Sequence, residues 1–560
     1  MESIGLVFGV FPIIFHRRNP DDSRFFILCV LVLSLSTTFM YVTRFPVPFN
    51  TDAPKEYEAA YATRNSWDPA LATSPSPSTE TGYHGWKLVW FYDYIGCLSV
   101  TILPSMISNM LGTDTMSVFT YVYPLLVSLL PLVFFVVVRR FAGDSNATYL
   151  SAAITPAYLV FSGGFMQYYR SAVGIFMLYL LLFCLVDKAR RITVPVILLT
   201  LGVVMSHYTV AYFGAIFLLI FTFSQKPKSI FRKIGLQWNA EKIVKPFTVG
   251  LFFVAMFLWG YYAERYMFAD HFDKLWFNLS TGFNFLRTSP EIGYLVGNRR
   301  GPILTSWFVV ELLSIGLGTL AGLYGILKGR TSGIKASWII CGSCAIAYVA
   351  AANLLLTSVN PILLEPTRVL VYVVPFAMLF LATLLLRARR TYGKCLAVVF
   401  VALMLPMNLM LPSNNYDLMF HTSSSLEPEM RSTWGTSFLL GTAYLEGANW
   451  IRQQIGVQDF IQVDSVSYGQ MIFGTFPVGL MDRYRPPIQI SRQASFESNM
   501  RYIRYLVVTD IFLEHGIWHQ IYTNRSTIIT AYDANGLLED SISNLVYNDK
   551  AVALFYSNSE

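Results

Sequence analysis

Acidic side chains gather in NTDAPKEYEAAY, at residues 50–61, which follows a strongly apolar run and contains Asp52, Glu56 and Glu58. If the chain turns helical after Pro54, Asp52 and Glu56 share one helix face, because residues four apart lie together. Two carboxylates so placed repel each other unless they share a divalent cation such as Mg or Mn, or exchange a proton with a substrate. The segment therefore predicts metal binding or general acid–base chemistry, with a solvated acidic loop as the alternative.

Four further ionisable residues lie in or at the ends of apolar runs, where charge is costly. Arg170 in QYYRSAV and Arg368 in LEPTRVL can each hold a phosphate in a fork of hydrogen bonds, or serve as interfacial anchors. His207 in SHYTVAY ends an apolar run, where it either contacts a substrate or serves as a packing residue. Glu311 in WFVVELLS lies inside a run, where an ionisable group indicates function by default unless it snorkels to the surface. We take these four and Glu58 as candidate substrate contacts.

The elements that position these residues are membrane helices, because the chain is long and unusually apolar. Its 560 residues are 54% hydrophobic and 13% charged, whereas soluble domains carry about 25% charged residues. Mean hydropathy is +0.48. Runs that approach the roughly 20 residues needed to cross a bilayer recur through residues 1–412. We expect eleven spans and a short twelfth at 4–15. The eleven are predicted at 25–43, 116–138, 148–165, 171–186, 193–207, 210–224, 247–264, 304–327, 336–357, 367–387 and 395–411.

Lysine and arginine are concentrated in the connections on one side of these spans. Six short connections hold 21 of the chain's 41 basic residues. The positive-inside rule makes that side cytoplasmic, so the net charge of +7 reflects topology and does not indicate a nucleic-acid partner. Loop 44–115, loop 265–303 and everything after residue 412 then face the outside of the cell membrane. Large loops carry function more often than short connections, so we expect the function on that side.

Two of the outer regions have recognisable patterns of their own. Residues 90–112 are amphipathic and predict a helix at the membrane interface, since Asp93 and Pro104 would interrupt a span. The tail contains GANWIRQQIG, typical of a helix, and the strand-like stretches DFIQVDS, YLVVTD and AVALFYS. We therefore predict a transmembrane domain at 1–412 and a soluble, extracytoplasmic α/β domain at 413–560.

Other motifs narrow the function classes. The sequence contains no Walker A loop, HExxH, zinc-ligand spacing or G-x-S-x-G elbow, which disfavours an ATPase, a zinc protease and a serine hydrolase. Gly318-x-x-x-Gly322 lies in an apolar run and predicts close packing against a neighbouring helix. A transporter or lipid-carrier flippase would also explain charge in the membrane, but it favours internal repeats, and none is evident. A non-catalytic envelope protein is the third alternative.

The plan of spans, outer acidic loop and outer tail resembles the GT-C superfamily of membrane glycosyltransferases. More narrowly, TDAPKEYE, NSWDP, LSVTILPSMISNMLG, YPLLVSLLPLVFF, SHYTVAY and the closing LVYNDKAVALFY are similar to an uncharacterised, largely archaeal family of multi-pass membrane proteins. The chain departs from that family's pattern at Ala53-Pro54, where the family has Ile-His, and in the residues after Arg170.

The resemblance implies a GT-C-like α-helical bundle of eleven or twelve spans with an outer C-terminal domain. It implies an inverting glycosyltransferase that moves a sugar from a polyprenyl-phosphate-type lipid donor to a glycan or protein acceptor at the outer face of the membrane. Asp52 takes the role of the acid in the first outer loop. The expected partners are the lipid-linked donor, the acceptor and the bilayer.

The basic bias makes a direct prediction about orientation. Cysteines introduced at Ser413 and Thr79 should react with a membrane-impermeant thiol reagent in intact cells, because both positions are predicted to lie outside. A cysteine introduced at Ser229, in one of the basic connections, is the matched control and should react only after the cells are permeabilised. The reverse pattern of labelling would overturn the orientation.

Overall fold

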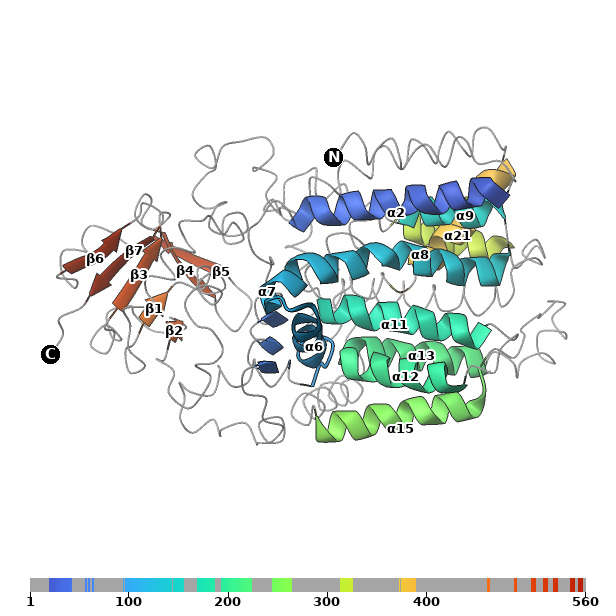
Figure 1. Cartoon of the computed structure of the whole chain (residues 1–560). Coiled ribbons are helices and arrows are strands. Elements are labelled where there is room, and N and C mark those ends of the chain that lie inside the picture. The colour runs from blue at the N-terminus through green and yellow to red at the C-terminus, as the bar shows by residue number, and fades with distance from the viewer. Residues whose placement is uncertain are drawn as a thin grey trace. The chain divides into compact units, whose positions relative to one another are not determined.

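The computed structural model describes helices between residues 20 and 388 and seven strands between residues 461 and 556 (Figure 1). The described residues are 20–42, 56–57, 59–60, 63–64, 94, 96–143, 145–155, 169–186, 193–223, 244–263, 313–325, 372, 374–388 and the strands given below.

The chain forms two compact units. The helical unit comprises residues 1–41, 96–99 and 121–411. The loop-and-tail unit comprises residues 42–95, 100–120 and 412–560. The predicted division of the chain at residue 412 into two domains stays a prediction.

Apolar helices make up the described part of the helical unit, and they run side by side in Figure 1. The helix α11 packs against α8 and α12, α15 packs against α12 and α13, and α21 packs against α9. The bounds are α2 Pro20–Val42, α8 Tyr123–Ala142, α9 Asn146–Ile154, α11 Tyr169–Val186, α12 Thr193–Ser206, α13 Tyr208–Phe223, α15 Pro246–Tyr262, an unlabelled helix Leu313–Gly325 and α21 Val374–Ala388.

Most predicted spans coincide with helices. Two helices, Thr115–Ala142 and Tyr169–Val186, are long and apolar enough to cross a membrane by length and composition. The helix α2 has 23 residues, and the other apolar helices that the structure describes are shorter. The span predicted at 148–165 begins in α9, which ends at Ile154. The spans predicted at 336–357 and 395–411, and the short one at 4–15, lie outside the described residues.

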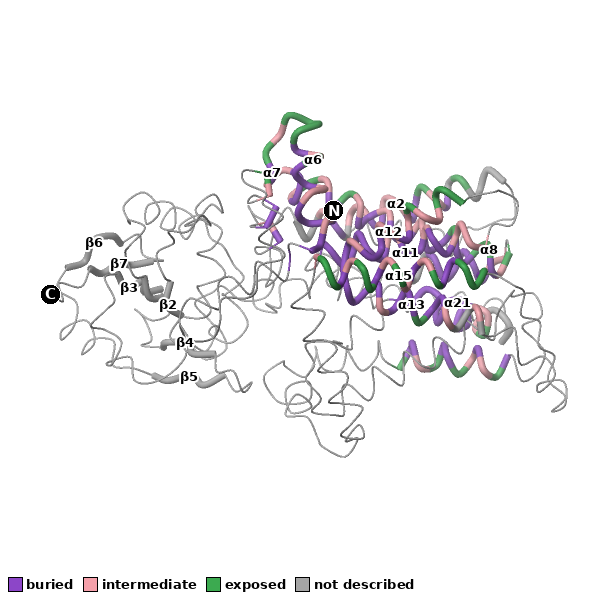
Figure 2. Tube along the Cα trace, turned by 90° about the horizontal axis from the view of Figure 1, so that it is seen from below, coloured by how far each residue is buried: buried purple, intermediate pink, exposed green. Residues whose placement is uncertain are grey.

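The outward faces of these helices are apolar, which is the reverse of a soluble bundle. Figure 2 shows buried residues on the faces between helices and exposed residues along the outward face of α15. The large exposed side chains of α15 are all hydrophobic. They are Phe247, Val254, Phe257, Leu258, Tyr261 and Tyr262. Extended exposed apolar surface marks contact with a membrane or a protein, and it agrees with the predicted bilayer.

Aromatic side chains fill the space between α8, α11 and α21. The rings of Phe134 and Tyr179 have centroids 4.2 Å apart, and Tyr179 also stacks on Phe376 at 6.0 Å. The Tyr179 hydroxyl donates a hydrogen bond of 2.6 Å to the carbonyl oxygen of Tyr372, just before α21. A buried tyrosine needs such a partner for its hydroxyl. These contacts place the start of α21 against the middle of α11.

The predicted interfacial helix is shorter than expected. The helix α6 covers Ile102–Leu111, whereas residues 96 and 98–101 are turns, so the prediction of a helix from residue 90 is wrong at its amino end. Pro104 explains the late start, because proline is accommodated in the first turn of a helix and breaks it further in. Gly112, with a φ of 63°, ends α6 in the left-handed region.

The two faces of α6 are inverted relative to a soluble helix. It buries Ser105 and Ser108 and exposes Met106, Met110 and Leu111. An apolar exposed face on a short helix is what an interfacial position requires. That position stays a prediction, now limited to Ile102–Leu111.

The structure describes seven strands in the tail. The strands β1 Ile461–Val463, β2 Ile488–Ile490, β3 Tyr505–Thr509, β6 Asn544–Asn548 and β7 Val552–Tyr556 form a sheet in the order β2-β1-β3-β7-β6. The strands β4 Ile517–Ile521 and β5 Thr527–Ala531 form an antiparallel pair. In the sheet, β1 is parallel to β2 and β3, and β7 is antiparallel to β3 and β6.

The strand predictions in the tail are confirmed at three places. DFIQVDS, YLVVTD and AVALFYS contain β1, β3 and β7. The predicted helix GANWIRQQIG lies outside the described residues, and the α/β class of the tail stays a prediction.

The close packing predicted for Gly318 is confirmed, and it provides a test of the helical unit. A Cβ built on Gly318 would lie 2.3 Å from the carbonyl oxygen of Ala377 in α21. Because that neighbour is backbone, Gly318→Ala must push the two helices apart, and overpacking of this kind destabilises by about 1–3 kcal/mol. Thermal unfolding of the detergent-solubilised protein measures the loss.

Gly250→Ala is the matched control for this experiment. A Cβ on Gly250 in α15 has no atom within 4 Å. Because alanine is the better helix former, this change should be neutral or stabilise by up to about 1 kcal/mol. Equal behaviour of the two variants would contradict the contact between Gly318 and α21.

Candidate functional site

Residues 96–99 satisfy the backbone at the end of α12. The N–H of Leu98 donates a hydrogen bond to the carbonyl oxygen of Met205 over 2.8 Å. The Ser99 hydroxyl donates to the carbonyl oxygen of Ser206 over 2.9 Å. The last four carbonyl groups of a helix have no partner within it, so this segment supplies two of the partners that the end of α12 needs.

The same segment contacts two further helix ends. The indole Nε1–H of Trp259, near the carboxyl end of α15, donates to the carbonyl oxygen of Gly96 over 2.9 Å. The hydroxyl of Tyr123, the first residue of α8, donates to the carbonyl oxygen of Ser99. Residues 96–99 therefore bring one end of α8, α12 and α15 to a common level.

Arg170 lies in the first turn of α11 at this level. Its neighbour Tyr169 stacks on Tyr123, with ring centroids 5.0 Å apart and an angle of 22° between the planes. Arg170 is only 4% exposed. A guanidinium at the amino end of a helix is opposed by the helix dipole and by the loss of water, so its burial requires groups that compensate its charge.

The starts of α11 and α13 are in close contact. A Cβ atom at position 174 would lie 3.0 Å from Cγ2 of Val210, which is closer than such atoms normally approach. Glycine has no Cβ and therefore allows this contact. Arg170 precedes Gly174 by four residues and therefore lies on the same face of α11. Val210 follows His207 by three residues. Arg170 and His207 therefore both lie about one turn before this contact.

His207 caps the amino end of α13. It stands between α12 and α13, is fully buried, and accepts a hydrogen bond at Nδ1 from the N–H of Thr209 over 3.0 Å. Its carbonyl oxygen accepts from the N–H of Ala211 over 3.0 Å, which is the first helical bond of α13. The ring stacks on Tyr208 with a centroid distance of 4.5 Å. His207 therefore has a structural role as a helix cap, in line with its alternative interpretation as a packing residue.

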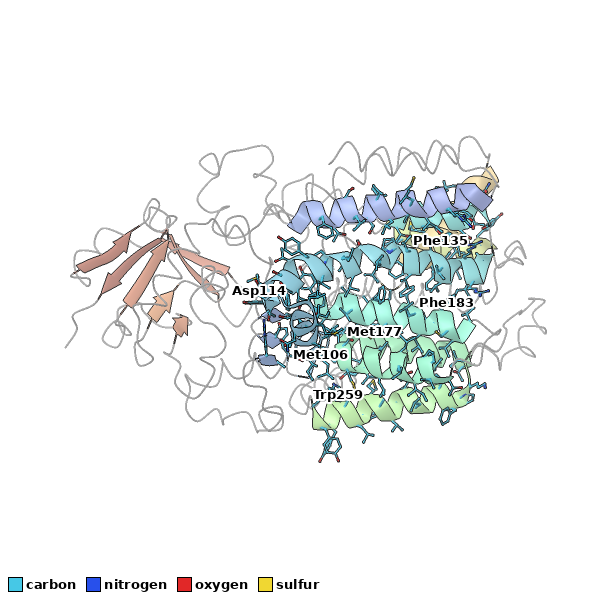
Figure 3. All side chains as sticks on the ribbon, in the orientation of Figure 1. Met106, Asp114, Phe135, Met177, Phe183 and Trp259 are labelled. Atoms are coloured by element: carbon cyan, nitrogen blue, oxygen red, sulfur yellow. The ribbon has the colours of Figure 1, made fainter. Side chains whose placement is uncertain are left out.

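The arginines of the predicted cytoplasmic connections lie at the other ends of α8 and α11. The guanidinium carbon of Arg139 lies 6.0 Å from the ring centroid of Phe135, and that of Arg140 lies 5.7 Å from the ring centroid of Phe183. In Figure 3, Phe135 and Phe183 lie toward one end of the helical unit and Trp259 toward the opposite end. Arg170 and His207 are therefore separated along the helix axes from the basic connections.

In the loop-and-tail unit, Glu56 is fully buried. Residues 56–57, 59–60 and 63–64 are helical, as expected if the helix begins after Pro54. Tyr57 meets Phe119 edge to face with ring centroids 5.8 Å apart, and the Ser105 hydroxyl of α6 donates to the carbonyl oxygen of Ala60 over 3.1 Å. Burial of a carboxylate costs several kcal/mol unless its charge is compensated. A solvated acidic loop is therefore excluded for Glu56.

Arg64 holds this segment to the residues after α6. Its Nη1 donates to the hydroxyl of Thr115 over 3.4 Å and to the carbonyl oxygen of Thr113 over 3.5 Å. Thr115 begins α7, Thr115–Ser117, whose amino end is capped by Asp114. The acidic segment is thus fixed against α6 and α7 by side chains that the sequence analysis did not single out.

Four predicted site residues lie outside the described residues. They are Asp52, Glu58, Glu311 and Arg368. The structure brings Arg170 and His207 to neighbouring helix starts in the helical unit, and it places Glu56 in the loop-and-tail unit. Among the described residues, no group of three or more His, Cys, Asp or Glu side chains is arranged to hold a metal ion.

Sequence reasoning missed two features of this region. Residues 96–99 join three helix ends, and a π-helical segment, Val118–Val122, precedes α8. The sequence signal for the first is Gly96 followed by two hydroxyl residues, Ser99 and Thr101, in an otherwise apolar stretch. The π-helix leaves no such signal, although such segments occur frequently at functional sites.

No protein-family model matches the chain, and no curated protein matches it. Solved structures are similar in backbone. The crystal structure of the Archaeoglobus fulgidus oligosaccharyltransferase with a tethered acceptor peptide has 11% identity and a TM-score of 0.48, over 91% of this chain and 74% of that one. ArnT from Cupriavidus metallidurans bound to undecaprenyl phosphate has 10% identity and a TM-score of 0.46, over 94% and 97%.

A third similar structure is the arabinofuranosyltransferase AftD from Mycobacteria, with 13% identity and a TM-score of 0.44, over 96% of this chain and 40% of that one. With TM-scores below 0.5, the likeness is a coarse one of backbone arrangement, and it assigns no residue role to this chain.

The hydrogen bond from Tyr123 to Ser99 provides a test of this helix-end cluster. Tyr123→Phe keeps the ring that stacks on Tyr169 and removes the hydroxyl that donates to a buried carbonyl. Leaving such a group unsatisfied costs about 1–3 kcal/mol, so the melting temperature should fall. Tyr121→Phe is the matched control, since Tyr121 is 59% exposed, and it should leave stability unchanged. A native melting temperature for Tyr123→Phe would exclude the bond as a source of stability.

Proposed function

We propose that the chain is an inverting glycosyltransferase that takes a sugar from a polyprenyl-phosphate-type lipid donor at the outer face of the membrane. The observation that carries the proposal is the buried Arg170 at the start of α11, beside the start of α13. Helix amino ends carry partial positive charge on their N–H groups, and Arg170 adds a full charge. Together, Arg170 and the starts of α11 and α13 supply positive charge within an apolar frame, which suits a lipid phosphate.

The proposed reaction is a single displacement. An acceptor oxygen attacks the anomeric carbon of the sugar as the bond from that carbon to the phosphate oxygen breaks. Asp52, as general base, takes the acceptor proton, and the lipid phosphate leaves with the bonding electrons. Negative charge grows on the phosphate during this step, so Arg170 and Arg368 are proposed to stabilise it.

The remaining predicted residues have supporting roles in the proposal. Glu56 is proposed to hold a divalent cation, Mg or Mn, together with Asp52, since carboxylate oxygens are the ligands these ions prefer. When bound, such a cation supplies charge neutralisation at the phosphate. The buried carboxylate of Glu56 fits that chemistry, and no step above depends on the cation. Glu58 and Glu311 stay predicted substrate contacts, and His207 is proposed to orient the phosphate or the acceptor.

The proposal is tested by replacing the general base. Lipid-linked sugars extracted from membranes of the source cells serve as the donor mixture, and release of free lipid phosphate by the purified protein measures transfer. Asp52→Asn should lower the rate by about 100- to 10,000-fold, the usual contribution of a positioned base. Glu80→Gln, in the Pro/Ser/Thr-rich part of the same loop, is the matched control and should retain the native rate.

Two outcomes would contradict the proposal. A native rate for Asp52→Asn would exclude that residue as the base. Movement of lipid across the bilayer of reconstituted vesicles, with no sugar transferred by the native protein, would favour the lipid-carrier flippase instead.

A further inference from the structure

The helix α15 has a defined length, because the structure describes both of its ends. It begins after Lys245, whose carbonyl oxygen accepts a hydrogen bond from the N–H of Thr248 over 2.9 Å. It ends before Ala263, whose N–H donates to the carbonyl oxygen of Trp259 over 2.8 Å. The helix has 17 residues and no charged side chain. At about 1.5 Å per residue its length is about 25 Å, whereas a typical hydrocarbon core is roughly 30 Å thick.

The exposed face of α15 changes in character along the helix (Figure 2). From Phe247 to Leu258, its large exposed side chains are aliphatic groups and phenyl rings. At its carboxyl end they are Tyr261 and Tyr262, which are 56% and 63% exposed. At its amino end the exposed residue is Lys245. Tyrosine is enriched where hydrocarbon meets lipid headgroups, and lysine extends its charge from an apolar surface toward water, so both ends suit a membrane interface.

The helix α8 shows the same order in the opposite chain direction. Tyr121, which is 59% exposed, lies just before its first turn, and the exposed Arg139 and Arg140 lie in its last turn. The large exposed side chains between them are Leu125 and Val136. The rise from the first residue of α8 to Arg139 is about 24 Å, which agrees with the length of α15.

Residues 96–99 bring the tyrosine ends of the two helices to one level. Tyr123 and Trp259 both donate hydrogen bonds to this segment. In Figure 3, Trp259 lies toward this end of the helical unit and Phe135, below Arg139, lies toward the other. Two helices of opposite direction therefore share a tyrosine level and a basic level. A bilayer requires such a match around the whole protein, whereas a protein partner on one face does not.

We propose that the exposed faces of α8 and α15 contact the acyl chains of a bilayer whose hydrocarbon core is thinned to about 25 Å at α15. The exposed tyrosines then lie among the headgroups of one leaflet, and the basic side chains lie among those of the other. Residues 96–99 share the headgroup level of the tyrosines. This depth is independent of the proposed function; only a lipid phosphate bound at the same depth rests on that function.

Nitroxide labels on introduced cysteines measure the depth in reconstituted vesicles. The positions are Phe247, Val254 and Tyr262, on the exposed face of α15, and the native protein carried through the same labelling gives the background from its own cysteines. Oxygen dissolves in hydrocarbon, whereas a nickel chelate stays in water. The label at Val254 should be accessible to oxygen and shielded from nickel. The labels at Phe247 and Tyr262, about 22 Å apart, should both be several-fold more accessible to nickel.

Two results of this measurement would overturn the proposal. Shielding of the label at Phe247 or Tyr262 from nickel would show a core too thick for α15. Shielding of the label at Val254 from both oxygen and nickel would show that protein, such as a second copy of this chain, covers the face instead of lipid.

Thermal unfolding of the native protein in vesicles of different acyl-chain length gives a test without labels. Dimyristoleoyl-, dioleoyl- and dierucoyl-phosphatidylcholine form successively thicker bilayers. Mismatch costs free energy for each ångström, so the melting temperature should be highest in the thinnest bilayer and lowest in the thickest. A melting temperature that is highest in the thickest bilayer, or equal in all three, would contradict a thinned core.

A double variant tests whether the tyrosines set the level. Replacing Tyr261 and Tyr262 by leucine lengthens the apolar face of α15 by about one turn and removes its interfacial hydroxyl groups. The highest melting temperature should then shift to a thicker bilayer. An unchanged lipid preference would exclude the tyrosines as the boundary. Absence of sugar transfer by the native protein would contradict the proposed function and leave these results unaffected.

Discussion

The turn between α12 and α13 depends on having every backbone group satisfied in an apolar surrounding. Only His207 separates the two helices. The last carbonyl groups of α12 and the first N–H groups of α13, which have no partner within their own helices, therefore lie within a few residues of each other. In a medium without water each unsatisfied group costs several kcal/mol. Leu98 and Ser99 donate to the end of α12, and the imidazole of His207 accepts from the start of α13.

This constraint also sets the electrostatics of the region. A sharp reversal between α12 and α13 places the amino end of α13 beside that of α11, and Gly174 allows the two helices to approach closely. The two amino ends carry partial positive charge, and the carboxyl end of α12 lies at the same level. The hydrogen bonds from residues 96–99 and the ring stack of Tyr123 on Tyr169 stabilise this arrangement of helix ends.

The parts of this structure that follow from local pattern could be predicted from the sequence, and those that depend on contacts between distant residues could not. Long apolar runs predicted α8, α11 and α15, and strand-like stretches rich in β-branched and aromatic residues predicted β1, β3 and β7. Arg170 and His207 were recognised because charge is rare at such positions. The sequence did not show that both residues lie near the contact between α11 and α13, because that depends on which helices are neighbours. The amino end of α6 was misplaced because the amphipathic pattern continues through turns that Pro104 keeps out of the helix.

The π-helical segment Val118–Val122 has a consequence for how this chain is compared with others. A π-turn holds one residue more than an α-turn, so side chains before and after it are out of phase by about a quarter turn relative to an unbroken α-helix. Phe119 faces Tyr57, and Tyr123 faces Tyr169, under that altered phase. An alignment that runs without a gap from LSVTILP to YPLLVSLLP would therefore pair inward positions with outward ones in any relative that lacks the π-turn. Low sequence identity in this helix can then reflect one inserted residue as well as divergent side chains.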